Sequence, residues 1–347
     1  MKPFLQSSDS RPGEVLDRPR TWCRKEPVVA SHTKRGFTTW FGAAIAGVFL
    51  AGCGVPLASR AASPAGNDES SRPATTTLFA RTNLVAWCIV PFDAGKRTPA
   101  ERAAMLQRLG FGWLAYDYRA EHVPTFDDEL VQLKKHNVRL LAWWFPGELN
   151  EEARHILDVL KRHDQRGVQL WVSGGGEPVR DAAEEKARIE GEVRRLRPIA
   201  EAAARQDCVV ALYNHGGWFG EPENQIKIIQ RLKADGVDNV GIVYNQHHGH
   251  AHLDRFEDLL RQMKPHLLAF NLNGMTRDGD QQGKKILPLG QGDLDLKLLR
   301  ILRDSGWQGP IGLLNHTDED AETRLRDNLA GLDRLVAQLD AQGTSAR

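Results

Sequence analysis

Short apolar runs alternate with longer amphipathic segments along the chain from Asn83 onward. Successive runs begin about 25 to 40 residues apart, and the segments between them repeat their hydrophobic residues at a helical spacing. This alternation is typical of repeated β-α units built around a parallel sheet. The predicted strands cover residues 84–90, 112–116, 138–144, 168–173, 208–213, 240–245, 267–272 and 310–315.

The amphipathic segments carry signals for the start and the end of helices. In Thr98-Pro99-Ala100-Glu101 a capping threonine precedes a proline and an acidic residue suited to the first turn. We expect Asn150, Glu221 with Pro222, and Asp293 to begin later helices. Glycines stand where helices should end before the next strand, at Gly110, Gly167, Gly236 and Gly306.

Eight such units in about 260 residues match the usual size of a closed (β/α)8 TIM barrel. An open, doubly wound sheet would more often carry a glycine-rich phosphate turn after its first strand, and Trp87–Pro91 contains none. The glycines of Ser173–Gly176 lack the spacing of a nucleotide loop, so they either leave space for a ligand or form a flexible loop. We therefore predict an α/β barrel over residues 78–340, followed by a C-terminal tail at 341–347.

The first 75 residues differ in composition from the rest. Lys34 and Arg35 precede an uncharged stretch at 36–52, which ends at Cys53 and leads into a segment rich in Ser, Ala, Pro and Gly. Leu50-Ala51-Gly52-Cys53 resembles a bacterial lipobox, which implies lipidation of Cys53. We interpret 1–52 as an N-terminal extension with a lipoprotein-type signal peptide, and 53–77 as a flexible linker.

Two kinds of membrane attachment fit this N-terminal pattern. One is a lipid anchor on the cysteine, and the other is an uncleaved apolar segment that spans the membrane. Both place residues 78 onward outside the cytoplasm, so we expect an exported, membrane-attached lipoprotein on the periplasmic or cell-surface side.

Charge and cysteine content narrow the range of partners. The 347 residues are 41% hydrophobic and carry a net charge of +1, which does not favour a nucleic acid partner. Cys88 and Cys208 fall within predicted strands, where buried thiols behave as small apolar side chains. No pattern in the sequence points to a particular oligomeric state.

Aromatic, amide and imidazole side chains gather at the predicted strand ends, the face where barrel enzymes carry their sites. Aromatic faces stack on the C–H faces of sugar rings, and amides, histidine and arginine match hydroxyl groups. This combination predicts a carbohydrate or polyol ligand, although about half of the tryptophans are expected to serve in packing alone. The predicted substrate-binding residues are Trp87, Arg119, Trp143, Trp171, Tyr213, Asn214, Asn245, His247, Asn271, Asn273, Gln291 and Asn315. Asp117, Trp144, Trp218, His250 and His316 also fall at strand ends, without an assigned role.

Histidines provide the candidates for acid–base chemistry. Glu221 could hold the tautomer of His215 and raise its basicity, or it could serve only as an acidic residue at a helix start. The histidines at 247, 248, 250 and 252 could suggest a metal site, but alternate residues of an extended loop point in opposite directions.

Four segments near the strand ends resemble a known family. They are Tyr213–Gly217, Asn245–His248, Pro288–Asp295 and Gly306–Leu314. In these segments the chain is similar to the xylose isomerase-like TIM barrels, which include sugar phosphate isomerases/epimerases and endonuclease IV-type enzymes. The resemblance extends over about residues 83 to 338 and implies a sugar isomerase or epimerase-like protein.

The resemblance also implies where a metal would be bound. Isomerases and epimerases of the family commonly hold a divalent cation through a Glu, an Asp, a His and a Glu after strands five to eight. By position these fall on Tyr213, Asn245, Asn271 and Asn315, and all four differ. Because an amide oxygen is neutral and a weaker donor than a carboxylate, we expect no cofactor and at most weak binding of a divalent metal.

Without the metal, other groups must stabilise negative charge that develops on a substrate oxygen. We expect His215 or Glu221 to act as general base, His248 as partner acid, and Arg119 with the asparagines to position the polyol. Trp87, Trp143 and Trp171 are expected to form stacking walls.

Three functions fit these residues. The first is an exported sugar isomerase or epimerase-like enzyme, the second a non-catalytic carbohydrate-binding lipoprotein, and the third a His/Glu-dependent lyase or hydrolase. Phosphodiester cleavage is the least expected, since it needs several metal-binding side chains.

Overall fold

The computed structural model describes residues 77–344. The predicted signal peptide, Cys53 and the linker up to residue 76 lie outside the described residues. Within residues 77–344, no helix combines the length and the apolar character needed to cross a membrane.

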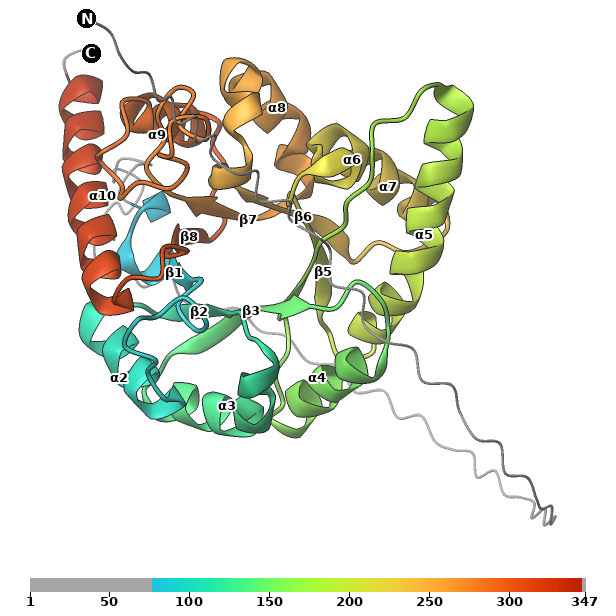
Figure 1. The fold of residues 1–347 in the computed structure, drawn as a ribbon, viewed down its shortest axis with the longest axis horizontal. Coiled ribbons are helices and arrows are strands. Elements are labelled where there is room, and N and C mark those ends of the chain that lie inside the picture. The colour runs from blue at the N-terminus through green and yellow to red at the C-terminus, as the bar shows by residue number, and fades with distance from the viewer. Residues whose placement is uncertain (1–76, 345–347) are drawn as a thin grey trace, which may run out of the picture. The chain divides into compact units, whose positions relative to one another are not determined.

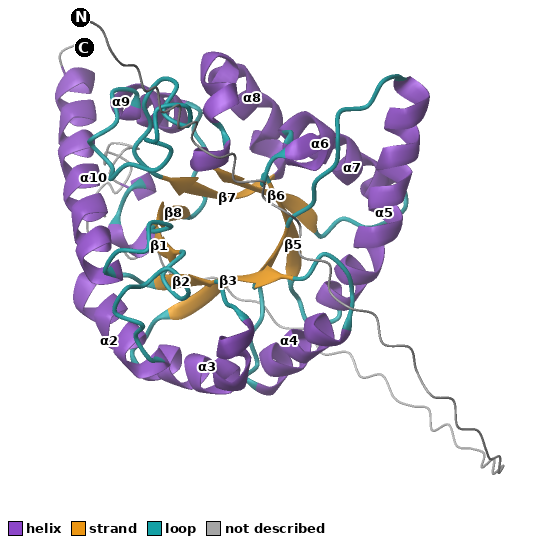
Figure 2. Cartoon of the chain, in the orientation of Figure 1, coloured by secondary structure: helices purple, strands orange, loops and turns teal. Residues whose placement is uncertain are grey.

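Eight parallel strands form a closed barrel, as the sequence predicts (Figures 1 and 2). Each strand pairs with the next in chain order, and β8 pairs with β1 so that Leu84 lies opposite Ile311. The strands are β1 (Leu84–Trp87), β2 (Trp113–Tyr116), β3 (Arg139–Phe145), β4 (Gln169–Val172), β5 (Val209–Tyr213), β6 (Val240–Asn245), β7 (Leu267–Leu272) and β8 (Ile311–Leu314).

Helices surround the barrel on the outside (Figure 2). The α-helices are α2 (Pro99–Leu109), α3 (Phe126–Lys135), α4 (Glu151–Arg162), α5 (Ala182–Ala204), α6 (Gly217–Gly220), α7 (Pro222–Ala234), α8 (Phe256–Met263), α9 (Asp295–Asp304) and α10 (Ala321–Thr344). Short 3-10 helices are η2 (Arg81–Asn83), η3 (Ala120–Thr125), η4 (Gln246–His248), η5 (His250–Arg255) and η6 (Lys264–His266). Helix α10 continues to Thr344, so residues 341–344 of the expected tail are helical.

Most of the predicted helix starts are confirmed. Thr98 forms a capping box with Glu101, and the Asn150 side chain accepts from the amide of Ala153. The prediction for Asp293 is wrong, because α9 begins at Asp295. The Asp295 carboxylate accepts from the backbone amides of Met275, Gly290 and Gly292, and it thereby ties the loop after β7 to α9.

The hydrophobic core has two layers because successive strand residues face opposite sides. One layer lies between the strands and the helices, and it contains Trp143 and Phe126. The other fills the barrel interior, where Trp87, Trp171 and Tyr213 pack among small residues such as alanine. These interior aromatic rings lie directly beneath the candidate site.

Candidate active site

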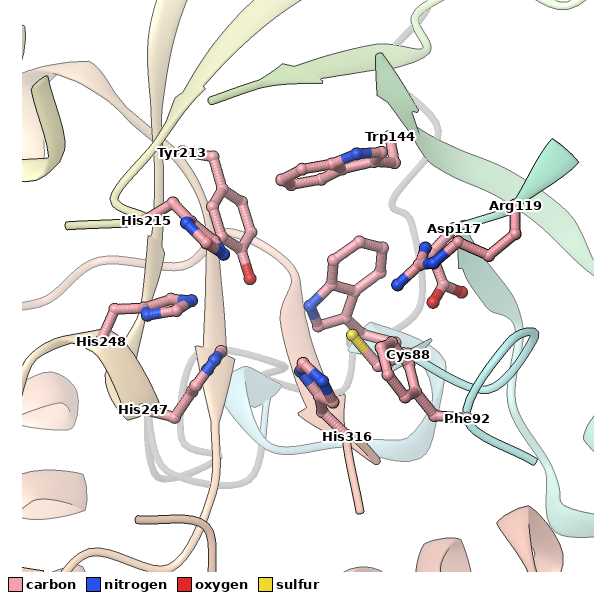
Figure 3. Close-up of a pocket in the computed structure, with 11 residues that line it drawn as sticks. Cys88, Phe92, Asp117, Arg119, Trp144, Tyr213, His215, His247, His248 and His316 are labelled. Carbon is pink, nitrogen blue, oxygen red and sulfur yellow. The ribbon is translucent and has the colours of Figure 1, made fainter. Parts of the chain in front are cut away.

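A pocket opens at the carboxyl ends of the strands, the face expected for a barrel of this kind. Its cavity volume is about 150 Å³, and the pocket is open to solvent. Aromatic, imidazole and charged side chains line it (Figure 3). They are Trp87, Cys88, Phe92, Asp117, Arg119, Trp144, Tyr213, His215, His247, His248 and His316.

Aromatic rings form the floor and one wall of this pocket. The ring centroid of Trp87 lies 6.2 Å from that of Trp144, and Trp144 meets Tyr213 edge-on at 5.0 Å. Trp171 does not line the pocket, because its ring lies in the barrel interior, 4.6 Å from Trp87, where its indole N–H donates to Gln169. Trp171 therefore supports the floor instead of forming the wall that the sequence predicts.

The predicted stacking role of Trp143 is wrong. Its ring lies outside the barrel, with its centroid 4.8 Å from that of Phe126 in α3 and 4.8 Å from that of Tyr116. Neighbouring residues in a strand face opposite sides, so Trp144 takes the place in the pocket that we expected for Trp143.

Four imidazoles border the pocket. The ring centroids of His215 and His248 lie 4.5 Å apart, those of His247 and His248 lie 3.7 Å apart, and those of His247 and His316 lie 5.9 Å apart. Burial is the main cause that lowers the pKa of each ring, and the positive charge of Lys285 adds to it. The pKa of His248 falls to about 3, so this imidazole is neutral at physiological pH.

Asp117 and Arg119 lie across the pocket from His215, His247 and His248 (Figure 3). Both carboxylate oxygens of Asp117 are buried, and neither makes a well-formed hydrogen bond within residues 77–344. Burial raises the pKa of this carboxyl to about 7, although the charge of Arg119 opposes the shift. Asp117 can therefore both give and accept a proton near neutral pH.

Arg119 is held by its neighbours and forms no ion pair with another residue of the described range 77–344. Its Nη1 donates to the carbonyl of Tyr118 at 2.7 Å, and its guanidinium lies 5.1 Å from the ring centroid of Phe92. Phe92 in turn packs against His316, with ring centroids 3.7 Å apart.

Asn214 and Asn245 do not line the pocket but support it. The Asn214 side chain bridges to the backbone of Asn245 in both directions, at 3.1 and 2.7 Å. The Asn245 amide donates to the Tyr213 hydroxyl, while its Oδ1 accepts from Nδ1 of His247 at 2.9 Å. Because Nδ1 must carry the proton in that bond, Nε2 of His247 is left as an acceptor.

The other predicted amides also lie outside the pocket. Asn315 donates to the carbonyl of Ala321, and Asn273 donates to that of Gly274, so both stabilise loops. Asn271 is buried in the barrel beside Gly312. Gln291 is exposed in the segment before α9. The sequence identifies these positions as strand ends, but it does not show which way each side chain turns.

The predicted pair of His215 and Glu221 is not formed. Glu221 instead accepts from Nη2 of Arg255 at 2.8 Å and lies 3.2 Å from Nε2 of His252. These contacts, with that to His252 first, lower the pKa of the carboxyl. Glu221 stands at the start of α7 and faces η5, away from the pocket, so its expected role as general base is wrong.

Comparison with known proteins identifies the family. The model of the xylose isomerase-like TIM barrel matches residues 103–335. The chain belongs to the xylose isomerase-like TIM barrel family. Comparison with curated proteins gives no match.

Solved structures share the fold of this xylose isomerase-like barrel. The 3-keto-D-glucoside 4-epimerase YcjR from E. coli has 16% identity and a TM-score of 0.54, covering 73% of this chain and 99% of its own. The D-psicose 3-epimerase from Clostridium cellulolyticum, solved with D-tagatose, has 12% identity and a TM-score of 0.53, covering 73% and 98%. The IOLI protein, which binds a zinc atom, has 15% identity and a TM-score of 0.56, covering 74% and 99%.

The residues at the metal positions of xylose isomerase-like barrels do not fit a divalent cation. Burial raises the pKa of Tyr213 well above its usual value, so the phenol keeps its proton, and it accepts a hydrogen bond from Asn245. The amide of Asn315 is committed to a loop carbonyl, which leaves only the neutral amide of Asn271 without a partner among the described residues. Within residues 77–344, no group of three or more His, Cys, Asp or Glu side chains is arranged to hold a metal.

Sequence reasoning missed several pocket residues of this xylose isomerase-like barrel. The sequence shows Asp117, Trp144 and His316 as strand-end residues, but nothing in it indicates that their side chains line the pocket. Phe92 lies in the loop after β1, and Cys88 is buried as expected but also borders the pocket. A cysteine at φ 58° immediately after β1 is what turns the chain here, and no sequence signal announces that turn.

Proposed function

We propose that this protein is an exported sugar isomerase or epimerase-like enzyme that acts on a carbohydrate at the mouth of the barrel without the family's usual metal. The observation that carries the proposal is the placement of acid–base groups on both sides of one aromatic pocket. Asp117 stands on one side, and His215 and His248 stand on the other. The relatives named as epimerases of psicose and of a keto-glucoside support a sugar as substrate.

Opposed acid–base groups suit epimerisation next to a carbonyl group. One group removes the proton from carbon, the electron pair moves to the carbonyl oxygen, and the other group returns a proton to the opposite face of the carbon. Asp117, with a pKa of about 7, can act as the acid or as the base. His215 takes the other role across the pocket. The same groups also permit isomerisation, in which one base carries a proton between adjacent carbons.

The role of His248 differs from the one expected from the sequence. With a pKa of about 3, its imidazole holds no extra proton at neutral pH and is a poor general acid. A neutral imidazole can still donate its N–H to the oxygen on which negative charge develops. His248 takes over part of the stabilisation that a metal provides in relatives with charged ligands.

Binding rests on the remaining pocket residues. Trp87 and Trp144 offer ring faces for the apolar side of a sugar, while Nε2 of His247 can accept from a hydroxyl group. Arg119 faces the same space. These contacts place the ring between the two acid–base sides.

One observation favours a second function, the non-catalytic carbohydrate-binding lipoprotein. Carboxylates and the histidine ligand are absent from all four family metal positions, as they would be if binding had been kept and catalysis lost. The His/Glu-dependent lyase or hydrolase receives no such support, because Glu221 is bound to His252 and Arg255.

A sugar screen distinguishes the two functions. Aldoses, ketoses and keto-glycosides are tested for thermal stabilisation of the purified protein, and stabilising sugars are then incubated with it and analysed by chromatography for epimers or isomers. New sugars formed by the wild type but not by His215→Ala support the enzyme. Stabilisation without any product supports the binding protein, and a screen with neither effect contradicts both.

A further inference from the structure

We propose that the ligand of this pocket is an anionic carbohydrate, a sugar acid whose carboxylate binds Arg119. This inference rests on the proposed function and specifies its class of substrate. It starts from Arg119, a cation in the pocket that pairs with no carboxylate among the described residues.

Arg119 presents a free hydrogen-bonding edge. Only Nη1 is used, in the bond to Tyr118, so Nε and Nη2 have no hydrogen-bond partner within residues 77–344. No described carboxylate lies within ion-pairing distance of the guanidinium. Nε and Nη2 together form the edge that binds a carboxylate through two parallel hydrogen bonds.

The other groups that face the pocket offer little negative charge. Cys88 and Tyr213 are buried, which raises the pKa of each well above its usual value, so both are neutral. Asp117 is the remaining acid, and at a pKa of about 7 it is only partly ionised at neutral pH. Negative charge supplied by a ligand would therefore meet limited repulsion.

The exposed Lys285 supplies positive charge near the opposite side of the pocket. After burial, which is the main cause, the charge of Lys285 helps to lower the pKa of His215, His247, His248 and His316. Lys285 itself forms no ion pair with a described carboxylate. This charge attracts an anion bound in the pocket.

Arg119 is exposed, and a neutral sugar that covered it would remove part of its hydration without supplying a charge to pair with it. A single planar guanidinium matches a carboxylate, and the expected export of the protein argues against a phosphorylated sugar. Trp87 and Trp144 then contact the sugar ring, while the bond between the ligand carboxylate and Arg119 fixes the orientation of the sugar.

Matched pairs of ligands test this inference by isothermal titration calorimetry at pH 7 and low salt. The pairs are D-glucuronate with D-glucose, D-galacturonate with D-galactose, and D-gluconate with sorbitol, and D-glucose 6-phosphate is added as a second anion. We expect at least one acid to bind about tenfold more tightly than its neutral partner, a difference typical of one charged hydrogen-bonded pair.

Two variants test whether Arg119 causes the difference in affinity between a sugar acid and its neutral partner. Arg119→Gln should weaken binding of the acid about tenfold more than binding of its neutral partner. The matched control is Arg139→Gln, because Arg139 also lies over an aromatic ring, that of Trp113 at 3.6 Å, but stands at the start of β3 and away from the pocket. Arg139→Gln should bind every ligand like the wild type.

The outcomes separate the two proposals. A neutral sugar that binds as tightly as its acid, or tighter binding of the 6-phosphate than of every sugar acid, overturns this inference and leaves the proposed function standing. No binding by any member of the pairs contradicts the proposed function as well. The comparison of ligands on the wild type decides the inference even if Arg119→Gln fails to fold.

Discussion

The imidazole rings of His215 and His248 lie with their centroids 4.5 Å apart, on the side of the pocket opposite Asp117. Within the part of the chain that the structure describes, neither ring is paired with a carboxylate, in contrast to the His215–Glu221 pair that the sequence suggests. The acid–base chemistry that we propose therefore depends on groups that face each other across the ligand.

Replacing His215 by alanine should lower turnover of a sugar substrate by about 10²- to 10⁴-fold, the usual contribution of a general base. Binding should remain measurable, because Trp87, Trp144 and Arg119 are unchanged. Steady-state kinetics and calorimetry on the same preparation check both values. Turnover equal to that of the wild type would remove His215 from the mechanism.

Asp117→Asn should stabilise the protein at neutral pH. A carboxyl whose pKa is raised in the folded state favours folding only while it is protonated, so stability falls as pH rises from about 4 to about 7. The raised pKa corresponds to at most about 4 kcal/mol above that range. Asparagine cannot ionise, so this loss should disappear.

Denaturant unfolding of the wild type and Asp117→Asn at pH 4 and pH 8 measures the effect. The buried histidines act in the opposite sense, since their lowered pKa values destabilise the fold as pH drops below about 6.5. Subtracting the variant from the wild type removes their shared contribution. A difference in stability that does not change with pH would refute the buried, unpaired state of Asp117.

Gly312→Ala should destabilise the barrel by about 1 to 3 kcal/mol, the usual cost of overpacking a core. A Cβ at this position would lie 1.8 Å from Oδ1 of Asn271, which is fully buried. The control is Gly175→Ala, where a Cβ meets no atom within 4 Å. Thermal unfolding of both variants should show a loss only for Gly312→Ala; equal stability would mean that Asn271 can move away.

We predict that Cys53 carries a lipid, as in a bacterial lipoprotein. Cells grown with a clickable palmitate analogue should label the wild type, and Cys53→Ala should abolish the label. Membrane association without any label on the wild type would support the uncleaved apolar anchor instead.

The sequence predicted the fold well but the site less completely. Every predicted strand appears in the structure. Helices also end before Gly110, Gly167, Gly236 and Gly306, which all have positive φ, as predicted. Both features depend on local periodicity and local backbone conformation. The order around the barrel follows from the repeated units.

Side-chain direction was harder to predict because it depends on a register of one residue. Trp143 and Trp144 are adjacent and identical in type, and only the barrel shows that Trp144 faces the pocket. Glu221 binds Arg255, which lies 34 residues further along the chain, and not His215. Asp117 became a candidate only once the structure showed its carboxylate buried without a well-formed hydrogen bond among residues 77–344.

Exchange of deuterium from D2O into a bound sugar, followed by NMR in the presence of EDTA, tests the central claim most directly. We predict that the wild type introduces deuterium at the carbon next to the carbonyl group with the chelator present, and that Asp117→Asn and His215→Ala do not. Exchange that occurs only after a divalent metal is added would contradict the account.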